Sequence, residues 1–320
     1  RRISFVLSSS IRASPIKVPG PVLVTGASGF VGTHLVEHLS KCGIRTVDWR
    51  RDTIDLLDRD LVRKYIDDLN PETIYHCAGA PHVASSWDDG ARPFESNVLA
   101  THYLLDAIRL TGKKCRILLP GSATVYQPST QAVTEEHPIE PSSPYAISKL
   151  AQEKLGIKAL AEDSIEVILT RSFNHTGPRQ APSFAAPSFA KQLALIECGR
   201  AEPIIKTGNL NAQRDITDVR DVVRAYHLLM EQGRPGVLYN VCSGVAYAIS
   251  DVLDELRQNI SCQVQVSVDQ KLLRKNDTDV QLGDPSRIKS ETGWNPTISF
   301  NDMLKDLLDY WKQTVKNHET

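Results

Sequence analysis

Residues 22–32 read VLVTGASGFVG. The run 22–25 is apolar and β-branched and predicts a buried strand, and apolar residues then recur at helical spacing between residues 30 and 39. Between these two elements stand Gly26, Gly29 and Gly32. A strand, a glycine turn and a helix form the context of a dinucleotide site, because glycines let backbone N–H groups approach a pyrophosphate at the positive end of a helix. The stretch predicts the first unit of a Rossmann sheet.

Further short apolar runs predict the other strands of this sheet. They lie at 44–49, 73–78, 115–119, 165–170 and 237–242, with helical patterns at 93–110, from about 145 and from about 250. This alternation predicts an α/β fold with a doubly wound parallel sheet. The repeated Pro, Ser and Phe at 181–189 indicate irregular structure that leaves the sheet, where a smaller α/β substrate domain should begin. The domains we expect are a tail at 1–19, a Rossmann domain at 20–172 to which 210–243 returns, and a substrate domain at 173–209 and 244–320.

Composition narrows the class of protein. The formal net charge is −1, so no field for nucleic acid is expected, and no apolar run is long enough for a membrane span. The six cysteines are scattered, so we expect reduced, packing thiols in a cytoplasmic protein and no metal site. Residues 1–17 are basic and Ser-rich; a transit peptide, a cloning remnant and a disordered tail all fit.

The stretch 143–149, SPYAISK, places a phenol and an ammonium on one helix face. Tyr145 and Lys149 are four residues apart, and such residues are neighbours on a helix. A nearby cation favours the phenolate, so we expect Lys149 to lower the pKa of Tyr145. Ser122 ends the strand predicted at 115–119, at the edge where open α/β sheets bind ligands. Ser122, Tyr145 and Lys149 are therefore the candidate catalytic residues.

The spacing GxxGxxG, followed by Ser122, Tyr145 and Lys149, resembles the extended branch of the short-chain dehydrogenase/reductase superfamily. The resemblance implies a nicotinamide cofactor and a homodimer built on the helices at 93–110 and from 145. It implies that the cofactor contacts Gly26, Ser28, Gly29, Phe30, Gly32, Asp55, Leu56, Ala78, Tyr145 and Lys149. As bare sequence, Asp55 fits equally well as a surface residue that starts the next helix. We expect His76 to be a satisfied core histidine and not a catalyst.

The end of the strand at 44–49 bears on the choice between NAD and NADP. Asp48 could hold a ribose 2′-hydroxyl, whereas arginines accommodate a 2′-phosphate. Counting from Gly43 as in similar proteins places Arg50 and Arg51 at the ribose. NADP(H) is therefore favoured, and NAD(H) remains possible.

Later blocks are similar to the nucleotide-sugar branch, and within it to reductases that convert GDP-4-keto-6-deoxy-D-mannose to GDP-D-rhamnose. They include RSFNHTGP at 171–178, QRDITDVRD at 213–221 and GDPSRIKSETGWNP at 283–296. The resemblance implies a nucleotide-sugar substrate, with GDP favoured, held by Ser86, Asn174, Lys191, Arg214, Arg274 and Asp277. Lys275 stands where the family often has proline, which weakens the inference of guanosine. Arg214 could instead have a structural role, as the partner of Asp215 or Asp218 in a salt bridge.

The triplet Ser122-Ala123-Thr124 bears on the reaction. Similar dehydratases carry an acid there, which elimination of water needs as a proton carrier. Similar reductases usually keep an acid at position 124, whereas Ser-Ala-Thr-Val-Tyr resembles a sugar 4-epimerase. The expected activity is reduction of a C4 ketone, with a 4-epimerase that keeps NAD tightly bound as the alternative. A non-catalytic cofactor-sensing protein on the same fold is a third possibility.

Overall fold

The computed structural model describes residues 20–81, 86–163, 165–273 and 278–317. The predicted tail at 1–19 lies outside these ranges, as do Arg274 and Asp277.

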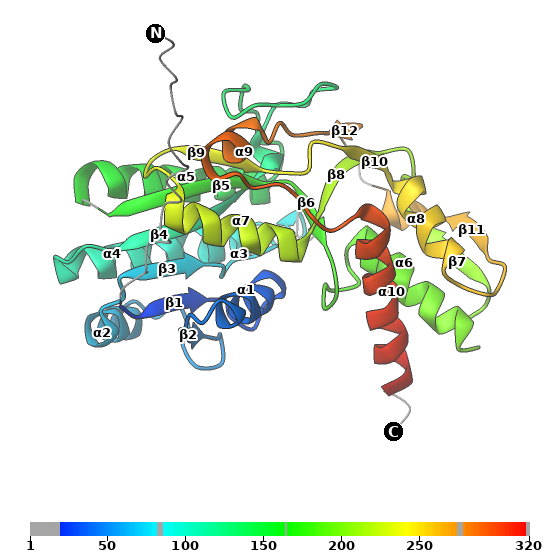
Figure 1. Cartoon of the computed structure of the whole chain (residues 1–320), viewed down its shortest axis with the longest axis horizontal. Helices are drawn as coiled ribbons and strands as arrows, with labels where there is room; N and C mark the ends of the chain where they lie inside the picture. Colours follow the sequence, from blue (N-terminus) through cyan, green and yellow to red (C-terminus); the bar gives the residue numbers. More distant parts are fainter. Residues whose placement is uncertain (1–19, 82–85, 164, 274–277, 318–320) are drawn as a thin grey trace, which may run out of the picture.

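The large sheet has six parallel strands in the order β2-β1-β3-β4-β5-β9 (Figure 1). Its strands are β1 (Val22–Thr25), β2 (Thr46–Trp49), β3 (Thr73–His76), β4 (Arg116–Ser122), β5 (Glu166–Ser172) and β9 (Leu238–Val241). The chain winds outward from β1 in both directions, so the strand order reverses beside β1. Ligands of open α/β sheets bind outside the carboxyl ends of the strands at such a point. The predicted doubly wound fold is confirmed.

Helices cover both faces of this sheet. One face carries α1 (Phe30–Lys41), α7 (Val219–Gln232) and α9 (Ser286–Thr292), and the other carries α2 (Arg59–Leu69), α4 (Ala100–Thr111) and α5 (Pro144–Asp163). Each face has its own apolar core, in which the strands contribute alternate side chains. Because the strands are buried on both sides, they appear in the sequence as continuous apolar runs.

The helix expected at 93–110 is present, but its turns are not uniform. It begins as α3 (Ala91–Pro93), widens into the π-helical segment η2 (Phe94–Leu99) and continues as α4. Single π turns inside helices often lie at functional sites. Here the wide turn holds the side chain of Asn97, which is fully buried.

The second unit lies beyond the carboxyl ends of the large sheet (Figure 1). Its sheets contain β6 (Asn174–Thr176), β8 (Gln213–Asp218), β10 (Ala246–Ala248) and β12 (Val280–Gln281), and separately β7 (Ile204–Thr207) paired with β11 (Gln265–Val268). Two short 3-10 turns are η3 (Ala123–Val125), directly after β4 of the large sheet, and η4 (Gln270–Leu272), after β11. The helices of the second unit are α6 (Ala185–Glu197), α8 (Ile249–Gln258) and α10 (Phe300–Asn317). These three helices share one apolar core.

Two late segments pack with the large sheet. Strand β9 is its last strand, in keeping with the expected return of 210–243, whereas β8 belongs to the small sheet. Further on, Ile288 and Trp294 are fully buried in the core beside α7, and the Trp294 indole N–H donates to the carbonyl of Asp221 at 3.0 Å. The predicted domain boundaries remain a prediction; by packing, residues 286–294 lie with the Rossmann unit.

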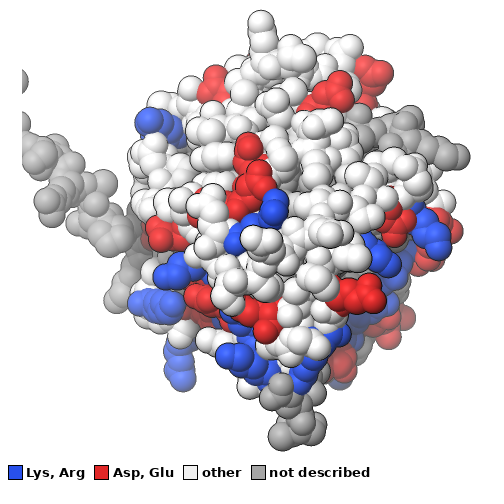
Figure 2. Space-filling model, turned by 90° about the vertical axis from the view of Figure 1, so that its right-hand side faces the viewer, with Lys and Arg blue, Asp and Glu red and all other residues white. Residues whose placement is uncertain are grey.

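The surface carries mixed charge. On the face formed by the second unit, basic and acidic side chains are interspersed, and neither sign covers a large area (Figure 2). None of the helices in the described ranges combines the length and the hydropathy needed to cross a membrane.

Candidate active site

The glycine turn after β1 has no room for a side chain at Gly26 or Gly32. Gly26 has φ +67°, and a Cβ there would lie 2.6 Å from the backbone nitrogen of Ala78. A Cβ on Gly32 would lie 2.1 Å from the carbonyl oxygen of Gly26. Gly29 is the N-cap of α1, and no side chain caps it. The turn therefore fits a dinucleotide: its backbone can approach a pyrophosphate at the positive end of α1.

Ser122 and Tyr145 meet at the carboxyl edge of the sheet. Ser122 is the last residue of β4, and its Oγ lies 2.9 Å from Oγ1 of Thr124. Tyr145 lies in the first turn of α5, which Pro144 opens and Ser143 caps by accepting a hydrogen bond from the backbone N–H of Ala146 at 3.1 Å. The start of the helix thus fixes the phenol beside the serine.

The ionisation of the pair differs from the prediction. Burial raises the pKa of Tyr145, and a hydrogen bond with Ser122 offsets only part of that rise. Burial also lowers the pKa of Lys149 to about 8. The expected lowering of the Tyr145 pKa is therefore wrong for this structure, because desolvation outweighs its neighbours. A phenol that remains protonated at neutral pH is suited to donate a proton.

A buried polar chain holds Lys149 and was not predicted. The Lys149 ammonium donates to Oε1 of Gln152, and Nε2 of Gln152 donates to Oγ1 of Thr101 at 2.8 Å. The only hydroxyl hydrogen of Thr101 goes to a backbone carbonyl, so Nε2 of His76, 2.9 Å away, is the donor to Thr101. His76 thus accepts from Thr25 on its other nitrogen, at 2.8 Å.

This arrangement requires a neutral His76, and burial lowers its pKa to about 3. The prediction of a satisfied core histidine is confirmed. Gln152 follows Lys149 by three residues on a helix, a spacing that could have revealed it. Thr101 comes from another helix, and sequence spacing gave no signal for it.

Asn97 is a second residue that the sequence did not reveal. Its Oδ1 accepts from the backbone N–H of Ala80 at 2.9 Å, and its Nδ2 donates to Oγ of Ser148 at 2.9 Å. The π turn therefore connects the loop after β3 to the helix of Tyr145 and Lys149.

The predicted ribose end follows β2. Arg50 and Arg51 are exposed, and neither forms an ion pair with another described residue. Asp48 is half-buried and accepts a hydrogen bond from Oγ1 of Thr46 at 2.6 Å. The acid thus has a partner within its own strand, whereas both arginines are exposed.

Asp55 and Leu56 follow in a turn. Oδ1 of Asp55 accepts from the backbone N–H of Leu57, and Leu56 packs against the core. The alternative that Asp55 starts the next helix is wrong, because Asp58 is the N-cap of α2 and accepts from the N–H of Leu61 at 3.0 Å.

Asn174 and Arg214 lie on neighbouring strands of the small sheet. Asn174 is exposed on β6 and pairs in register with Ile216 of β8, two residues after Arg214. Arg214 is buried and donates to the carbonyl of Gln213 at 2.8 Å. Asp218 pairs with Arg220 at 2.6 Å. The fold thus places two of the predicted substrate residues on adjacent strands.

Other predicted substrate residues lie in separate places. Ser86 is buried in the loop after β3. Ala78, which was predicted to contact the cofactor, lies against the glycine turn. Lys191 is on α6, with Nζ 5.5 Å from the ring centre of Trp311 on α10. Arg274 and Asp277 are outside the described residues.

Comparisons with known proteins agree with this geometry. The family model described as GDP-mannose 4,6 dehydratase matches residues 52–307. A relative from Pseudomonas aeruginosa named GDP-6-deoxy-D-mannose reductase is 32% identical, and the alignment covers 92% of this chain and 98% of the relative.

Solved structures show the same similarity. A structure described as RMD from Pseudomonas aeruginosa complexed with NADPH has a TM-score of 0.85 and 31% identity, over 92% of this chain and 100% of that one. The UDP-glucose 4-epimerase of Thermus thermophilus, in complex with NAD, has a TM-score of 0.80 and 25% identity, over 91% and 99%. The predicted resemblance is confirmed: the chain belongs to the GDP-mannose 4,6-dehydratase family of extended short-chain dehydrogenases/reductases.

Proposed function

We propose that this protein reduces the C4 ketone of GDP-4-keto-6-deoxy-D-mannose with NADPH and forms GDP-D-rhamnose and NADP⁺. The observation that carries the proposal is the 32% identity to the relative named GDP-6-deoxy-D-mannose reductase over 98% of that relative. The NADPH in the similar solved structure supports the cofactor, as do the two exposed arginines after β2.

The chain's residues have distinct roles in this reaction. When bound, the nicotinamide supplies a hydride, which forms the new C–H bond at C4 of the sugar. Tyr145 donates its phenolic proton to the C4 oxygen, so that the ketone becomes an alcohol. Ser122 donates a hydrogen bond to the same oxygen and stabilises its developing negative charge. The ammonium of Lys149 stabilises the phenolate that Tyr145 leaves behind.

The site lacks the groups that elimination of water needs. Ala123 and Thr124 follow Ser122, and neither can carry a proton between carbon and oxygen as a carboxylate does. Thr124 instead offers a second hydroxyl beside Ser122, at 2.9 Å. A nearby acid, Glu153, is committed to a buried ion pair with Arg171 at 2.8 Å. These features support reduction over dehydration.

A 4-epimerase is the second candidate. The similarity to the UDP-glucose 4-epimerase favours it, together with the series Ser-Ala-Thr-Val-Tyr at 122–126. An epimerase would purify with stoichiometric NAD and turn over without added NADPH. A reductase would consume one NADPH for each sugar.

The proposal extends to the sugar side. Ser86, Asn174, Lys191, Arg214, Arg274 and Asp277 would surround the nucleotide sugar, with Arg214 and Lys191 meeting the diphosphate. Paired cationic hydrogen bonds are what hold such a group. The position of Asn174 and Arg214 on adjacent strands supports this arrangement.

A cytoplasmic homodimer completes the proposal. The helix at 91–111 and α5 expose large apolar side chains, which are Phe94, Leu99, Leu110, Ile147 and Ile157. Such side chains on two helices support an interface with a second copy of the chain. All six cysteines are free thiols, which supports a reducing compartment.

The test is the loss of NADPH absorbance in the presence of GDP-4-keto-6-deoxy-D-mannose. NADH and the TDP-linked ketosugar are run beside it. We expect rapid consumption only with NADPH and the GDP sugar. Absence of consumption, with the sugar still protecting the protein against heat, would reject reduction of this substrate and favour the epimerase.

A further inference from the structure

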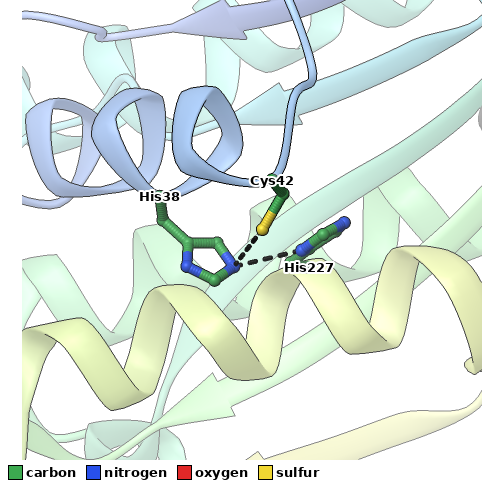
Figure 3. A group of neighbouring side chains, drawn as sticks. All are labelled: His38, Cys42 and His227. Carbon is green, nitrogen blue, oxygen red and sulfur yellow. Dashed lines mark hydrogen bonds between the residues drawn. The ribbon is translucent and has the colours of Figure 1, made fainter.

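Two helices on the back of the large sheet each present a pair of metal-ligating residue types at the same spacing. His38 and Cys42 are four residues apart at the end of α1, and His227 and Glu231 are four apart on α7. Residues at this spacing share one helix face. Because α1 packs against α7, the two pairs face each other, and Figure 3 shows the imidazoles of both histidines and the thiol of Cys42 converging between the helices.

The distances between these groups are close to those around a bound zinc ion. Nε2 of His38 lies 3.0 Å from Nδ1 of His227 and 3.9 Å from Sγ of Cys42. One ligand atom from each of the three residues lies within 4.8 Å of the others. Zinc bonds of about 2.0–2.1 Å to nitrogen and about 2.3 Å to sulfur place tetrahedral ligand atoms about 3.3–3.6 Å apart. The observed distances bracket this range, so small side-chain rotations suffice to bind an ion.

His38 and His227 each turn one ring nitrogen toward the other, with 3.0 Å between Nε2 of His38 and Nδ1 of His227. Zinc binds the lone pair of a neutral imidazole, so an ion at this place would replace the hydrogen that the two rings share.

Glu231 is placed to orient His227. Its Oε1 lies 3.5 Å from Nε2 of His227, and this buried nitrogen has no hydrogen-bond partner among the described residues. Metal-bound histidines usually donate their second ring N–H to a carboxylate, which fixes the tautomer and strengthens the ligand. A small shift of Glu231 would supply that bond and leave Nδ1 of His227 free to face the ion.

We propose that His38, Cys42 and His227 form a zinc site of this protein, with Glu231 as the carboxylate behind His227. Thiolate and imidazole ligands suit zinc, and the exposure of Cys42 leaves room for a fourth ligand from solvent. The ion would clamp the end of α1 to α7. Since α1 is 12 residues long, this clamp lies about 18 Å from the glycine turn, so its role is to stabilise the fold rather than to take part in reduction.

The test is zinc binding by the full-length protein after treatment with a chelator. We expect about one zinc per chain with a dissociation constant below about 1 μM, a Tm raised by a few degrees, and a thiolate-to-cobalt absorption band when Co²⁺ replaces zinc. The band reports directly on a thiolate ligand.

Four variants locate the site. Cys42→Ser should abolish the cobalt band and weaken zinc binding at least about tenfold, and His38→Gln should weaken it similarly. Glu231→Gln should weaken binding about 10- to 100-fold while the band persists. Cys198→Ser, another free thiol, is the matched control and should change nothing.

The reductase rate with NADPH separates this site from the active site, and we expect Cys42→Ser to leave it unchanged. Two results would overturn the proposal: fewer than about 0.1 zinc ions bound per chain at micromolar zinc, or the same affinity in Cys42→Ser and His38→Gln as in the unaltered protein.

Discussion

The cofactor side and the sugar side of this molecule are built in different ways. On the cofactor side, the glycine turn directly follows β1, Ser122 ends β4 of the same sheet, and Tyr145 and Lys149 share one helix. On the sugar side, Arg214 lies on β8, whose neighbours β6, β10 and β12 come from distant parts of the chain. The first side is specified by short local motifs, the second by long-range pairing.

Asp215 shows how the sugar side is held together. It is fully buried and accepts hydrogen bonds from the backbone N–H groups of Ser243 at 2.7 Å, Gly244 at 2.8 Å and Gly283 at 3.4 Å. One carboxylate thus joins three segments that are far apart in sequence. We therefore expect substitutions on the cofactor side to change the catalytic rate or the affinity for the cofactor. Substitutions on the sugar side should change only the affinity for the sugar.

The largest expected effect is that of Tyr145→Phe, a substitution in the catalytic site, where the cofactor and the sugar would meet. Removing the proton donor should lower kcat at least about 100-fold, with little change in KM or in NADPH affinity. Steady-state kinetics and NADPH titration measure both. Tyr103→Phe, on another helix, is the control. A variant that keeps more than about a tenth of kcat would exclude Tyr145 as the proton donor.

Gly32→Ala tests the cofactor side alone. Its Cβ would lie 2.1 Å from the carbonyl oxygen of Gly26, so the turn must shift. We expect NADPH affinity to fall about 10- to 100-fold, since such overpacking costs about 1–3 kcal/mol. Fluorescence titration with NADPH measures the change. Gly90→Ala, where the nearest atom lies at 3.7 Å, should have no effect. Equal NADPH affinity in both variants would contradict a tight phosphate turn.

The double variant Arg50→Ala plus Arg51→Ala tests whether the cofactor side distinguishes NADPH from NADH. Loss of exposed charge-assisted hydrogen bonds to a 2′-phosphate should weaken NADPH about tenfold and leave NADH unchanged. The measurement is the dissociation constant of each cofactor. Arg45→Ala, at another exposed arginine, is the control. If both cofactors lose affinity equally, the arginines do not read the 2′-phosphate.

Arg214→Gln tests the sugar side. Loss of a cation facing the diphosphate should raise KM for the GDP sugar about tenfold and leave NADPH affinity unchanged. Steady-state kinetics at saturating NADPH measure KM for the GDP sugar, and titration with NADPH measures the affinity for the cofactor. A fall in NADPH affinity of the same size would show that the two sides are not independent.

The smallest effect concerns pH. The pKa of Lys149 is about 8, below its ordinary value, so the ammonium loses its proton as pH rises through 8. The phenolate of Tyr145 then loses its stabilising charge, and kcat/KM for reduction should fall about fourfold between about pH 7 and about pH 8.5. Lys149→Arg keeps its charge at these pH values and should lose this dependence. An unchanged pH profile in that variant would assign the titration to another group.

Local motifs explain how much the sequence could predict. The turn at Gly26, the strand ends and the pair Tyr145 and Lys149 are determined by neighbouring residues, so their positions were predictable. The pKa of Tyr145 was not, because it depends on how deeply the fold buries the phenol.

Contacts between distant segments explain the rest. Thr101 reaches Gln152 only because α4 packs beside α5, and His227 reaches His38 only because α7 packs on α1. The expectation that all cysteines are packing residues is wrong for Cys42, which is exposed at the end of α1. Neither periodicity nor spacing records which helices become neighbours.

The most direct test of the central claim uses NADPH deuterated at both C4 positions of the nicotinamide, with GDP-4-keto-6-deoxy-D-mannose as substrate. Mass spectrometry of the nucleotide sugar reports where the hydride goes. Hydride transfer to C4 predicts one deuterium in each product molecule and one NADP⁺ formed for each sugar. Recovery of the unlabelled ketosugar, without net oxidation of NADPH, would contradict the reductase.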